Sequence, residues 1–163
     1  LFFPITRKKL VKDNPQIASE TYQGHGESIL IVDDVKEQRQ IASQMLTKLG
    51  YNVNSVSSGE EALRYIKNNP ADLLVLDMIM SPGIDGLETY KKILELHPGQ
   101  KVIIASGFSE TERVKEAQKL GAGQYIKKPY TMGKIGIAVR TELDQAGFSK
   151  PPKTEKNNAM INA

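Results

Sequence analysis

The sequence contains no cysteine, so the protein has neither disulfides nor thiolate chemistry. No apolar run approaches the roughly 18 to 20 residues that a membrane-spanning helix needs, and no signal-peptide pattern opens the chain. We therefore expect a cytoplasmic protein without direct membrane contact. The first residue is Leu1 rather than Met, which favours a piece of a longer protein.

The central part of the chain also lacks an excess of charge of either sign. The net charge is +3 over 163 residues, yet basic and acidic side chains are equal in number between residues 28 and 146. The basic excess lies in the flanks, which is typical of solvated tails, at Arg7, Lys8, Lys9, Lys12, Lys150, Lys153 and Lys156. We expect no nucleic-acid binding by the central region.

The chain is long enough for one domain with a substantial core and flanking segments. Residues 1–27 open with LFFPIT and end in the linker-like GHGE. Residues 147–163 contain Pro-Pro and lack apolar periodicity, which predicts a disordered tail. We place the domain itself at residues 28–146.

Short apolar runs alternate with helical patterns throughout the predicted domain. The runs are short enough for strands covered on both faces, at residues 29–32, 52–56, 73–76, 102–105 and 124–126. Apolar stripes mark the helices between and after them, with Ile41, Met45, Leu46 and Leu49; Ala62, Leu63 and Ile66; Leu87, Ile93 and Leu96; Val114, Ala117 and Leu120; and Ile135, Ala138, Val139 and Leu143. This alternation predicts an α/β fold with a parallel sheet and helices on both faces.

Two helix starts carry a capping-box spacing. Ser58 precedes Glu61 at the second helix, and Ser109 precedes Glu112 at the fourth. In this motif the hydroxyl caps the N–H three residues later, so the spacing predicts that these helices begin just after the two serines.

Polar residues follow four of the predicted strands. Asp33 and Asp34 come after the first strand, and Asp77 after the third. Ser106 follows the fourth strand and Lys128 the fifth. Asp34 alone could be a helix cap and Asp77 a turn residue, while Ser106 could be a loop hydroxyl and Lys128 a surface charge. In an open parallel sheet, however, ligands bind at the carboxyl ends of the strands, so the five together predict one site.

Three neighbouring carboxylates repel one another unless a cation holds them. Oxygen ligands without nearby histidine or cysteine favour a hard cation, and Mg²⁺ suits a site with few protein carboxylates. Mg²⁺ with a lysine and a hydroxyl is the equipment of phosphoryl transfer. A carboxylate can be the nucleophile and form an aspartyl phosphate. Asp77 is the candidate, because the Asp33 and Asp34 pair can hold the metal.

The segments ILIVDD, LLVLDMIMSPGIDGLE, VIIASG and QYIKKPY, in this order, resemble the receiver domain of two-component response regulators over residues 28–146. The resemblance implies a flavodoxin-like, doubly wound (βα)5 fold with strand order 2-1-3-4-5. It implies that Asp77 takes a phosphoryl group from a phosphohistidine. It also implies that Asp34 binds Mg²⁺ directly, that Asp33 supports it partly through water, and that the backbone carbonyl of Ile79 is a further ligand.

The same resemblance assigns the remaining site residues. Ser106 and Lys128 would each contact a phosphoryl oxygen, and the bond from Lys128 to Pro129 would be cis. Lys127 would point to the other face of the strand. Ser106 would move toward the phosphoryl group and Tyr125 would turn inward, repacking the surface formed by the fourth helix, fifth strand and fifth helix. The alternative for Tyr125 is an ordinary half-buried strand aromatic.

Two departures from the family pattern concern the surroundings of Asp77. The segment MIMSPGI between Asp77 and Asp85 is one residue longer than the common spacing. Ile79 and Phe108, at positions that flank the phosphoryl group in the family, are both apolar. Apolar side chains cannot orient an attacking water by hydrogen bonding, so we hypothesise a phosphoaspartate that hydrolyses slowly.

Two interpretations of the whole protein fit the sequence. LFFPIT resembles the closing strand of a histidine-kinase ATP-binding domain, which favours a hybrid sensor kinase. The phosphodonor would then be the kinase dimerisation domain of the same chain or of a partner protomer. The alternative is a stand-alone receiver that shuttles phosphate to a histidine phosphotransfer protein, and a homodimer also stays open.

Three other classes fit less well. A haloacid-dehalogenase-like phosphatase needs a second Asp where Ile79 stands. A dinucleotide-binding domain needs a glycine-rich turn in place of DDVKEQ. A degenerate receiver that acts only as an interaction module would lack one of the five site residues, and none is missing.

Overall fold

The computed structural model describes residues 20–145. The elements are β1 (Ser28–Val32), α2 (Lys36–Lys48), β2 (Asn52–Val56), α3 (Gly59–Asn68), β3 (Leu73–Asp77), α4 (Gly86–Leu96), β4 (Lys101–Ser106), α5 (Glu112–Lys119), β5 (Tyr125–Lys127) and α6 (Met132–Asp144). All strand pairs are parallel, and the sheet order is β2-β1-β3-β4-β5. The predicted fold class and strand order are confirmed. LFFPIT and the predicted tail, residues 147–163, lie outside the described residues.

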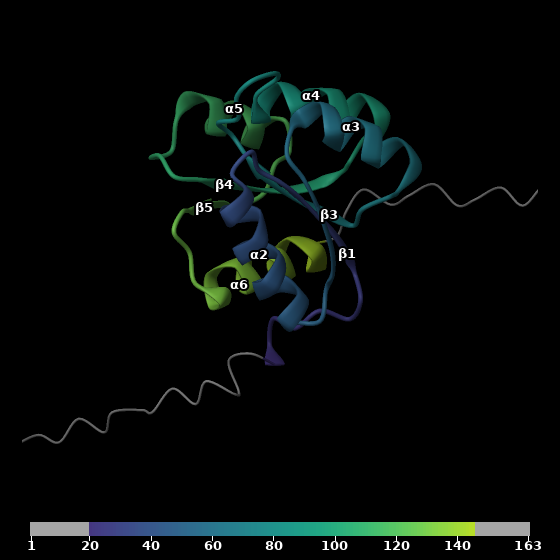
Figure 1. Cartoon of the computed structure of the whole chain (residues 1–163), viewed down its shortest axis with the longest axis vertical. Coiled ribbons are helices and arrows are strands. Elements are labelled where there is room, and N and C mark those ends of the chain that lie inside the picture. The colour runs from purple at the N-terminus through teal and green to yellow at the C-terminus, as the bar shows by residue number, and fades with distance from the viewer. Residues whose placement is uncertain (1–19, 146–163) are drawn as a thin grey trace, which may run out of the picture.

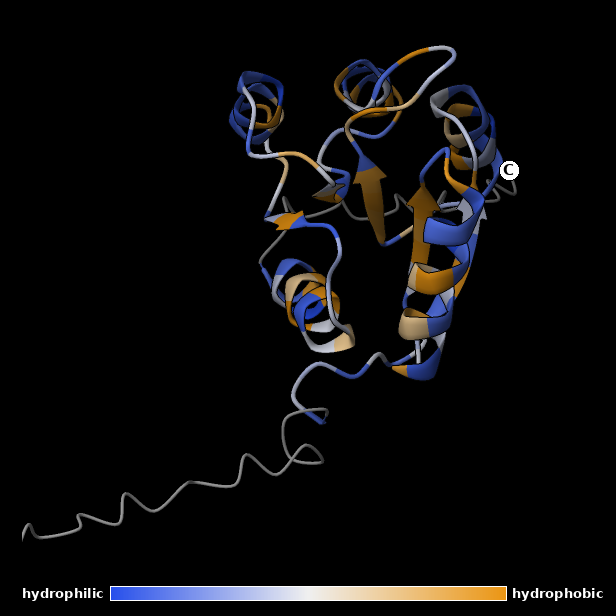
Figure 2. Cartoon of the chain, turned by 60° about the vertical axis from the view of Figure 1, so that its left-hand side comes forward, coloured by the Kyte–Doolittle hydropathy of each residue, from blue (hydrophilic) through white to orange (hydrophobic). Residues whose placement is uncertain are grey.

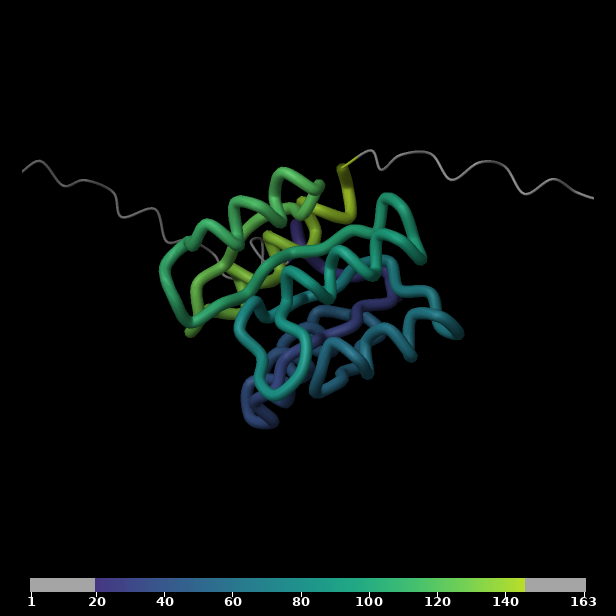
Figure 3. The backbone as a smooth tube through the Cα atoms, turned by 90° about the horizontal axis from the view of Figure 1, so that it is seen from above, coloured from purple at the N-terminus to yellow at the C-terminus, as the bar shows by residue number. Residues whose placement is uncertain are grey.

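The sheet lies between two layers of helices (Figure 1). Successive side chains of a strand point to opposite faces. One face packs against α3, α4 and α5 through Leu30, Val32, Leu74, Leu76, Val102 and Ile104. The other face packs against α2 and α6 through Ile29, Ile31, Leu73, Val75, Ile103 and Ala105. Figure 2 shows these apolar strands between helices of mixed hydropathy, and Figure 3 shows α3, α4 and α5 side by side.

The two edge strands correct the expectation that all five strands are covered on both faces. Only the three central strands are almost fully buried, whereas exposed residues recur along β2 and one ends β5. An edge strand has a neighbouring strand on one side only, so its outer side stays open to solvent. Among the described helices, none is long and apolar enough to cross a membrane.

The helix starts follow local chemistry, with one correction. The Ser58 hydroxyl accepts a hydrogen bond from Glu61 N–H at 3.2 Å, as predicted. The fourth predicted helix, α5, is capped by Thr111 rather than Ser109, because Thr111 is extended and its hydroxyl accepts from Val114 N–H at 3.4 Å. Ser109 stays in the exposed loop before the cap.

Three residues of the predicted apolar stripes are exposed. Ile41 is 50% exposed, because the buried stripe of α2 runs through Ala42 and Leu46 one position further on. Leu96 is the last residue of α4, and Leu120 caps the end of α5. Both side chains lie at the C-terminal ends of their helices and are about two fifths exposed.

The segment before β1 packs on the domain. Tyr22 is buried, and a Cβ added at Gly136 of α6 would lie 2.4 Å from its ring. Tyr51 OH donates to the Tyr22 carbonyl at 3.1 Å. Gly24 N–H donates to the Leu49 carbonyl at 2.7 Å. Residues 20–27 therefore continue the folded structure at the α6 face rather than leading away from it.

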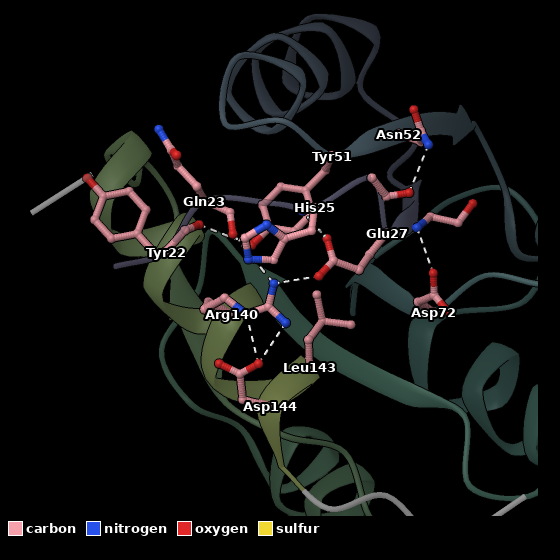
Figure 4. A network of polar contacts seen from close by, with 12 residues as sticks. Tyr22, Gln23, His25, Glu27, Tyr51, Asn52, Asp72, Arg140, Leu143 and Asp144 are labelled. Carbon is pink, nitrogen blue, oxygen red and sulfur yellow. Dashed lines mark hydrogen bonds and ion pairs between the residues drawn. The ribbon is translucent and has the colours of Figure 1, made fainter. Parts of the chain in front are cut away.

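Arg140 of α6 joins this segment to the end of its own helix (Figure 4). Its guanidinium donates to Glu27 Oε1 at 2.6 Å and to Asp144 Oδ1 at 2.7 and 2.9 Å. Burial acts to raise the pKa of Glu27, but the hydrogen bonds from Arg140 and from His25 N–H outweigh it and lower the pKa. The ionised Glu27 thus stabilises the folded state.

We expect Arg140→Ala to lower the free energy of unfolding by about 1–2 kcal/mol, because Glu27 loses its charge-assisted hydrogen bond from Arg140. The lowered pKa of Glu27 means that its contribution exists above the unfolded pKa and disappears as the pH falls through the folded pKa. Urea unfolding at neutral and acid pH would measure this. Lys92→Ala is the control, since its pair with Glu88 is half exposed and a loss below about 0.5 kcal/mol is expected. Equal losses in the two variants would refute the role of Arg140.

Candidate functional site

The parallel sheet brings the predicted polar residues to one edge. Asp33 and Asp34 follow β1, whereas Asp77 ends β3 and Ser106 ends β4. Lys128 follows β5 directly. Asp33, Asp77, Ser106 and Lys128 are all buried, with at most 9% of each residue exposed. Burial of four polar residues at one sheet edge indicates a built site rather than solvated surface groups.

Lys128 is the cation of this site. Its ammonium donates to Asp33 Oδ2 and, at 3.2 Å, to Asp77 Oδ2. Its side chain is 8% exposed, while the neighbouring Lys127 is exposed, as strand alternation predicts. The peptide bond from Lys128 to Pro129 is cis, also as expected. The alternative interpretation of Lys128 as a solvated surface charge is therefore wrong.

The two adjacent aspartates are not helix caps. The N-cap of α2 is Val35, and no side chain caps it. Asp33 Oδ1 instead accepts from Val35 N–H at 2.9 Å. Asp34 is not buried, and its Oδ2 accepts from Ser81 N–H, in the loop after β3, at 3.3 Å. Both carboxylates are thus aimed at the site edge.

Three carboxylates are close enough to share one metal ion. Asp33, Asp34 and Asp77 each offer an oxygen, and the three oxygens lie within 4.8 Å of one another. Oxygen donors of this kind suit a hard divalent cation such as Mg²⁺. Asp33 already holds Lys128 and Val35 N–H, so it has less capacity for direct coordination than Asp34. The donor set fits the predicted cation.

The electrostatics of Asp77 follow from its position. Burial raises the pKa of its carboxyl group; the charge of Lys128 and the N–H of Ile79 oppose the shift, whereas Asp33 adds to it. The Ile79 N–H donates to Asp77 Oδ1 at 3.1 Å. The Ile79 side chain itself is half exposed. Asp77 is therefore a partly desolvated carboxylate with one oxygen toward Lys128 and the other toward the following loop.

Phe108 links Ser106 to Tyr125. Its N–H donates to the Ser106 hydroxyl at 3.4 Å, and its carbonyl accepts a hydrogen bond from Tyr125 OH. The Phe108 side chain is 62% exposed, whereas Tyr125 packs partly against the core. The loop after β4 therefore touches both residues predicted to act in a switch.

Two residues beside the site escaped the sequence analysis. Tyr130 lies two residues after Lys128, and burial together with Asp33 and Asp77 raises its pKa to about 12. Glu60, in the first turn of α3, accepts from Ile84 N–H at 3.0 Å in the loop that follows Asp77. Tyr130 could have been suspected from its closeness to Lys128 in the sequence. Glu60 carried no such signal, because its partner lies 24 residues away.

The fold and the site together define a class of protein. Its members are doubly wound parallel α/β domains with acidic residues and one lysine at the carboxyl edge of the sheet. The model of the response regulator receiver domain family matches residues 29–140. The chain belongs to this family.

Known relatives agree with this membership. The chain is 32% identical to the chemotaxis protein CheY of Thermotoga maritima over 111 residues, which are 68% of this chain and 92% of that protein. It is 33% identical to sporulation initiation phosphotransferase F of Bacillus subtilis over 117 residues, covering 72% and 94%. A solved CheX-CheY-BeF3-Mg complex of Borrelia burgdorferi is similar at 30% identity and a TM-score of 0.67, covering 71% of this chain and 87% of that chain.

Proposed function

We propose that this receiver domain takes a phosphoryl group onto Asp77 from a phosphohistidine, with Mg²⁺, and changes conformation in response. The observation that carries the proposal is the surroundings of Asp77. Its carboxylate is buried at the end of a central strand, 3.2 Å from the Lys128 ammonium and beside two further carboxylates. A nucleophile, a cation and metal ligands are thereby in one place.

The reaction is a direct phosphoryl transfer. A carboxylate oxygen of Asp77 attacks phosphorus, and the phosphorus–nitrogen bond of the phosphohistidine breaks as the new phosphorus–oxygen bond forms. The imidazole leaves with the bonding electron pair and takes a proton from solvent. Mg²⁺, when held by Asp34, Asp77, the Ile79 carbonyl and more loosely Asp33, supplies positive charge to the phosphoryl oxygens.

Lys128 and Ser106 are the two side chains that donate hydrogen bonds to the phosphoryl oxygens. Lys128 already contacts Asp77, so a phosphoryl group on that carboxylate comes within its reach. Charge-assisted hydrogen bonds from an ammonium are the strong ones. The Ser106 hydroxyl ends the adjacent strand β4, whose Ala105 pairs with Asp77. Its O–H is the donor for a second phosphoryl oxygen.

The switch follows from the contacts of Phe108. When Ser106 turns toward a phosphoryl oxygen, it leaves its hydrogen bond with Phe108 N–H, and the loop after β4 is released to move. Tyr125 follows, because its hydroxyl is bonded to the Phe108 carbonyl. The surface of α5, β5 and α6 then repacks. A local change of charge thereby biases a two-state packing element.

The phosphodonor is a histidine kinase or a histidine phosphotransfer protein. We favour a hybrid kinase as the parent, on the likeness of LFFPIT to a kinase closing strand. A stand-alone receiver is the second candidate, supported by two relatives that this chain covers over more than nine tenths of their length. The coding sequence upstream of Leu1 decides between them.

The direct test is phosphoryl uptake from acetyl phosphate, a small phosphodonor that needs no partner protein. With Mg²⁺ present, the intact mass should increase by one phosphoryl group, and hydroxylamine should remove it, as it does from acyl phosphates. Chelation of Mg²⁺ should stop the uptake. A mass that stays unchanged in the presence of Mg²⁺ would refute the proposed function.

The exposed side chains of Ile79 and Phe108 beside the site bear on the lifetime of the phosphorylated state. We expect Ile79→Asn to accelerate hydrolysis of the aspartyl phosphate by about tenfold. This is less than the roughly 10²–10⁴-fold of a positioned general acid or base, because an amide can orient the attacking water but does not take its proton. Decay of the phosphorylated protein, followed by intact mass, measures the rate. Ile79→Val is the control and should decay like the wild type. Equal decay of the Asn and Val variants would contradict the hypothesis.

A further inference from the structure

The loop between Asp77 and α4 is in contact with two of the three carboxylates of the site. Ile79 N–H donates to Asp77 Oδ1 at 3.1 Å, and Ser81 N–H donates to Asp34 Oδ2 at 3.3 Å. At its far end, Gly86 N–H donates to the Met78 carbonyl at 3.1 Å. The path of this loop therefore sets where two hydrogen-bond donors point.

The stretch of the loop after Ser81 is held from outside the site by Glu60. Glu60 Oε1 accepts from Ile84 N–H at 3.0 Å. Gly83 has a φ of +105°, which L side chains rarely adopt, and a Cβ there would lie 2.6 Å from Glu60 Oε1. The backbone of the loop thus passes directly over the Glu60 carboxylate, and glycine makes this approach feasible.

Glu60 itself is well placed to act as an anchor. It lies in the first turn of α3, whose start is fixed by the Ser58 cap. The next residue, Glu61, is bonded to Ser57 and does not compete for the loop. The Ile84 N–H holds the pKa of Glu60 below its ordinary value, so its carboxylate is ionised at neutral pH. A fixed helix terminus thereby presents an acceptor to a longer loop.

We infer that Glu60 is a positioning residue for the metal site. Glu60 fixes the loop between Asp77 and α4 through its hydrogen bond with Ile84 N–H, and this loop in turn orients Asp34 through the Ser81 N–H. The inference rests on the proposed function, since it concerns the affinity of that site for Mg²⁺. The extra residue between Asp77 and Asp85 gives the physical reason. A longer loop has more conformations to lose when it is ordered, and the Glu60 contact reduces that number before the metal arrives.

The test compares the Mg²⁺ affinity of three variants with that of the wild type, by titration of backbone amide NMR shifts. Glu60→Ala removes the acceptor, and we expect its Mg²⁺ dissociation constant to rise about three- to tenfold, as for loss of one hydrogen bond. Glu60→Gln removes the same charge but keeps an oxygen for Ile84 N–H, so near wild-type affinity is expected. Glu88→Ala removes a carboxylate from the exposed side of α4 and should leave the affinity unchanged.

The outcomes separate this inference from the proposed function. Faster hydrogen exchange at Ile84 and Ser81 together with weaker Mg²⁺ binding, in Glu60→Ala but not in Glu60→Gln, supports it. Wild-type affinity in Glu60→Ala overturns it and leaves the proposed function intact. Equal weakening in the Ala and Gln variants also overturns it, because charge rather than the hydrogen bond would then matter. A wild type that does not bind Mg²⁺ overturns both.

Discussion

Asp77→Asn is expected to reduce phosphoryl uptake from acetyl phosphate to below detection. The amide that replaces the carboxylate has the same shape but is a poor nucleophile, because its nitrogen lone pair is delocalised and its oxygen carries no full charge. Of the remaining carboxylates, Asp33 is already bonded to Lys128 and to Val35 N–H, and Asp34 accepts from Ser81 N–H at the less buried side of the site. Both are proposed metal ligands and are not expected to replace Asp77 as the nucleophile. The intact mass after incubation with acetyl phosphate and Mg²⁺ measures the loss.

Asp144→Asn serves as the matched control for this experiment. Asp144 is an exposed carboxylate at the end of α6, paired with Arg140, and lies outside the site. Its replacement should leave uptake at the wild-type level. Persistent phosphorylation of Asp77→Asn, at the same stoichiometry as in the control, would place the phosphoacceptor elsewhere and overturn the assignment.

Lys128→Ala is expected to lower the free energy of unfolding by about 3 kcal/mol at neutral pH without Mg²⁺. The substitution leaves the two carboxylates of Asp33 and Asp77 buried without the ammonium that pairs with both. Removing one partner of a buried ion pair is costly because the remaining charge stays desolvated. Urea unfolding of the variant and the wild type measures the difference.

The pH dependence of this loss has a definite sign. Burial places the folded pKa of Asp77 above its ordinary value of 3.8 even with Lys128 present. The ionised carboxylate therefore destabilises the folded state as the pH rises through the folded pKa, and protonation relieves the cost. In Lys128→Ala the pKa should rise further, so the stability deficit should shrink as the pH is lowered.

Lys127→Ala is the control for Lys128, since the two lysines are neighbours and only one is buried. The exposed Lys127 should change stability by less than about 0.5 kcal/mol. A deficit in Lys128→Ala that matches that of Lys127→Ala, or that grows toward acid pH, would show that Lys128 does not balance the buried carboxylates.

The parts of the fold that depend on simple periodicity could be predicted from the sequence. Runs such as residues 29–32 and 73–76 are apolar on both faces, and only a sheet covered on both sides buries them. Once the strands are parallel, their carboxyl ends meet at one edge. The convergence of Asp33, Asp77 and Lys128 follows from that geometry, so the grouping of these residues could be predicted from the sequence.

The contacts that escaped prediction depend on side chains that meet across long sequence separations. Arg140 reaches Glu27 across 113 residues, and Glu60 reaches Ile84 across 24. In the sequence, nothing distinguishes Arg140, Glu27 and Glu60 from solvated surface charges. The cap of α5 was predicted wrongly for a different reason. Ser109 and Thr111 are both good caps, and only the backbone conformation selects Thr111.

The most direct test of the central claim is backbone NMR of the wild type and Asp77→Asn with Mg²⁺ and beryllofluoride, a mimic of the phosphoryl group. If Asp77 is the phosphoacceptor coupled to a switch, shifts in the wild type will depend on Mg²⁺, begin near Asp77 and extend to Ser106, Phe108 and Tyr125. The same shifts will be missing in the variant. A wild type that does not respond, or a variant that responds equally, would contradict the account.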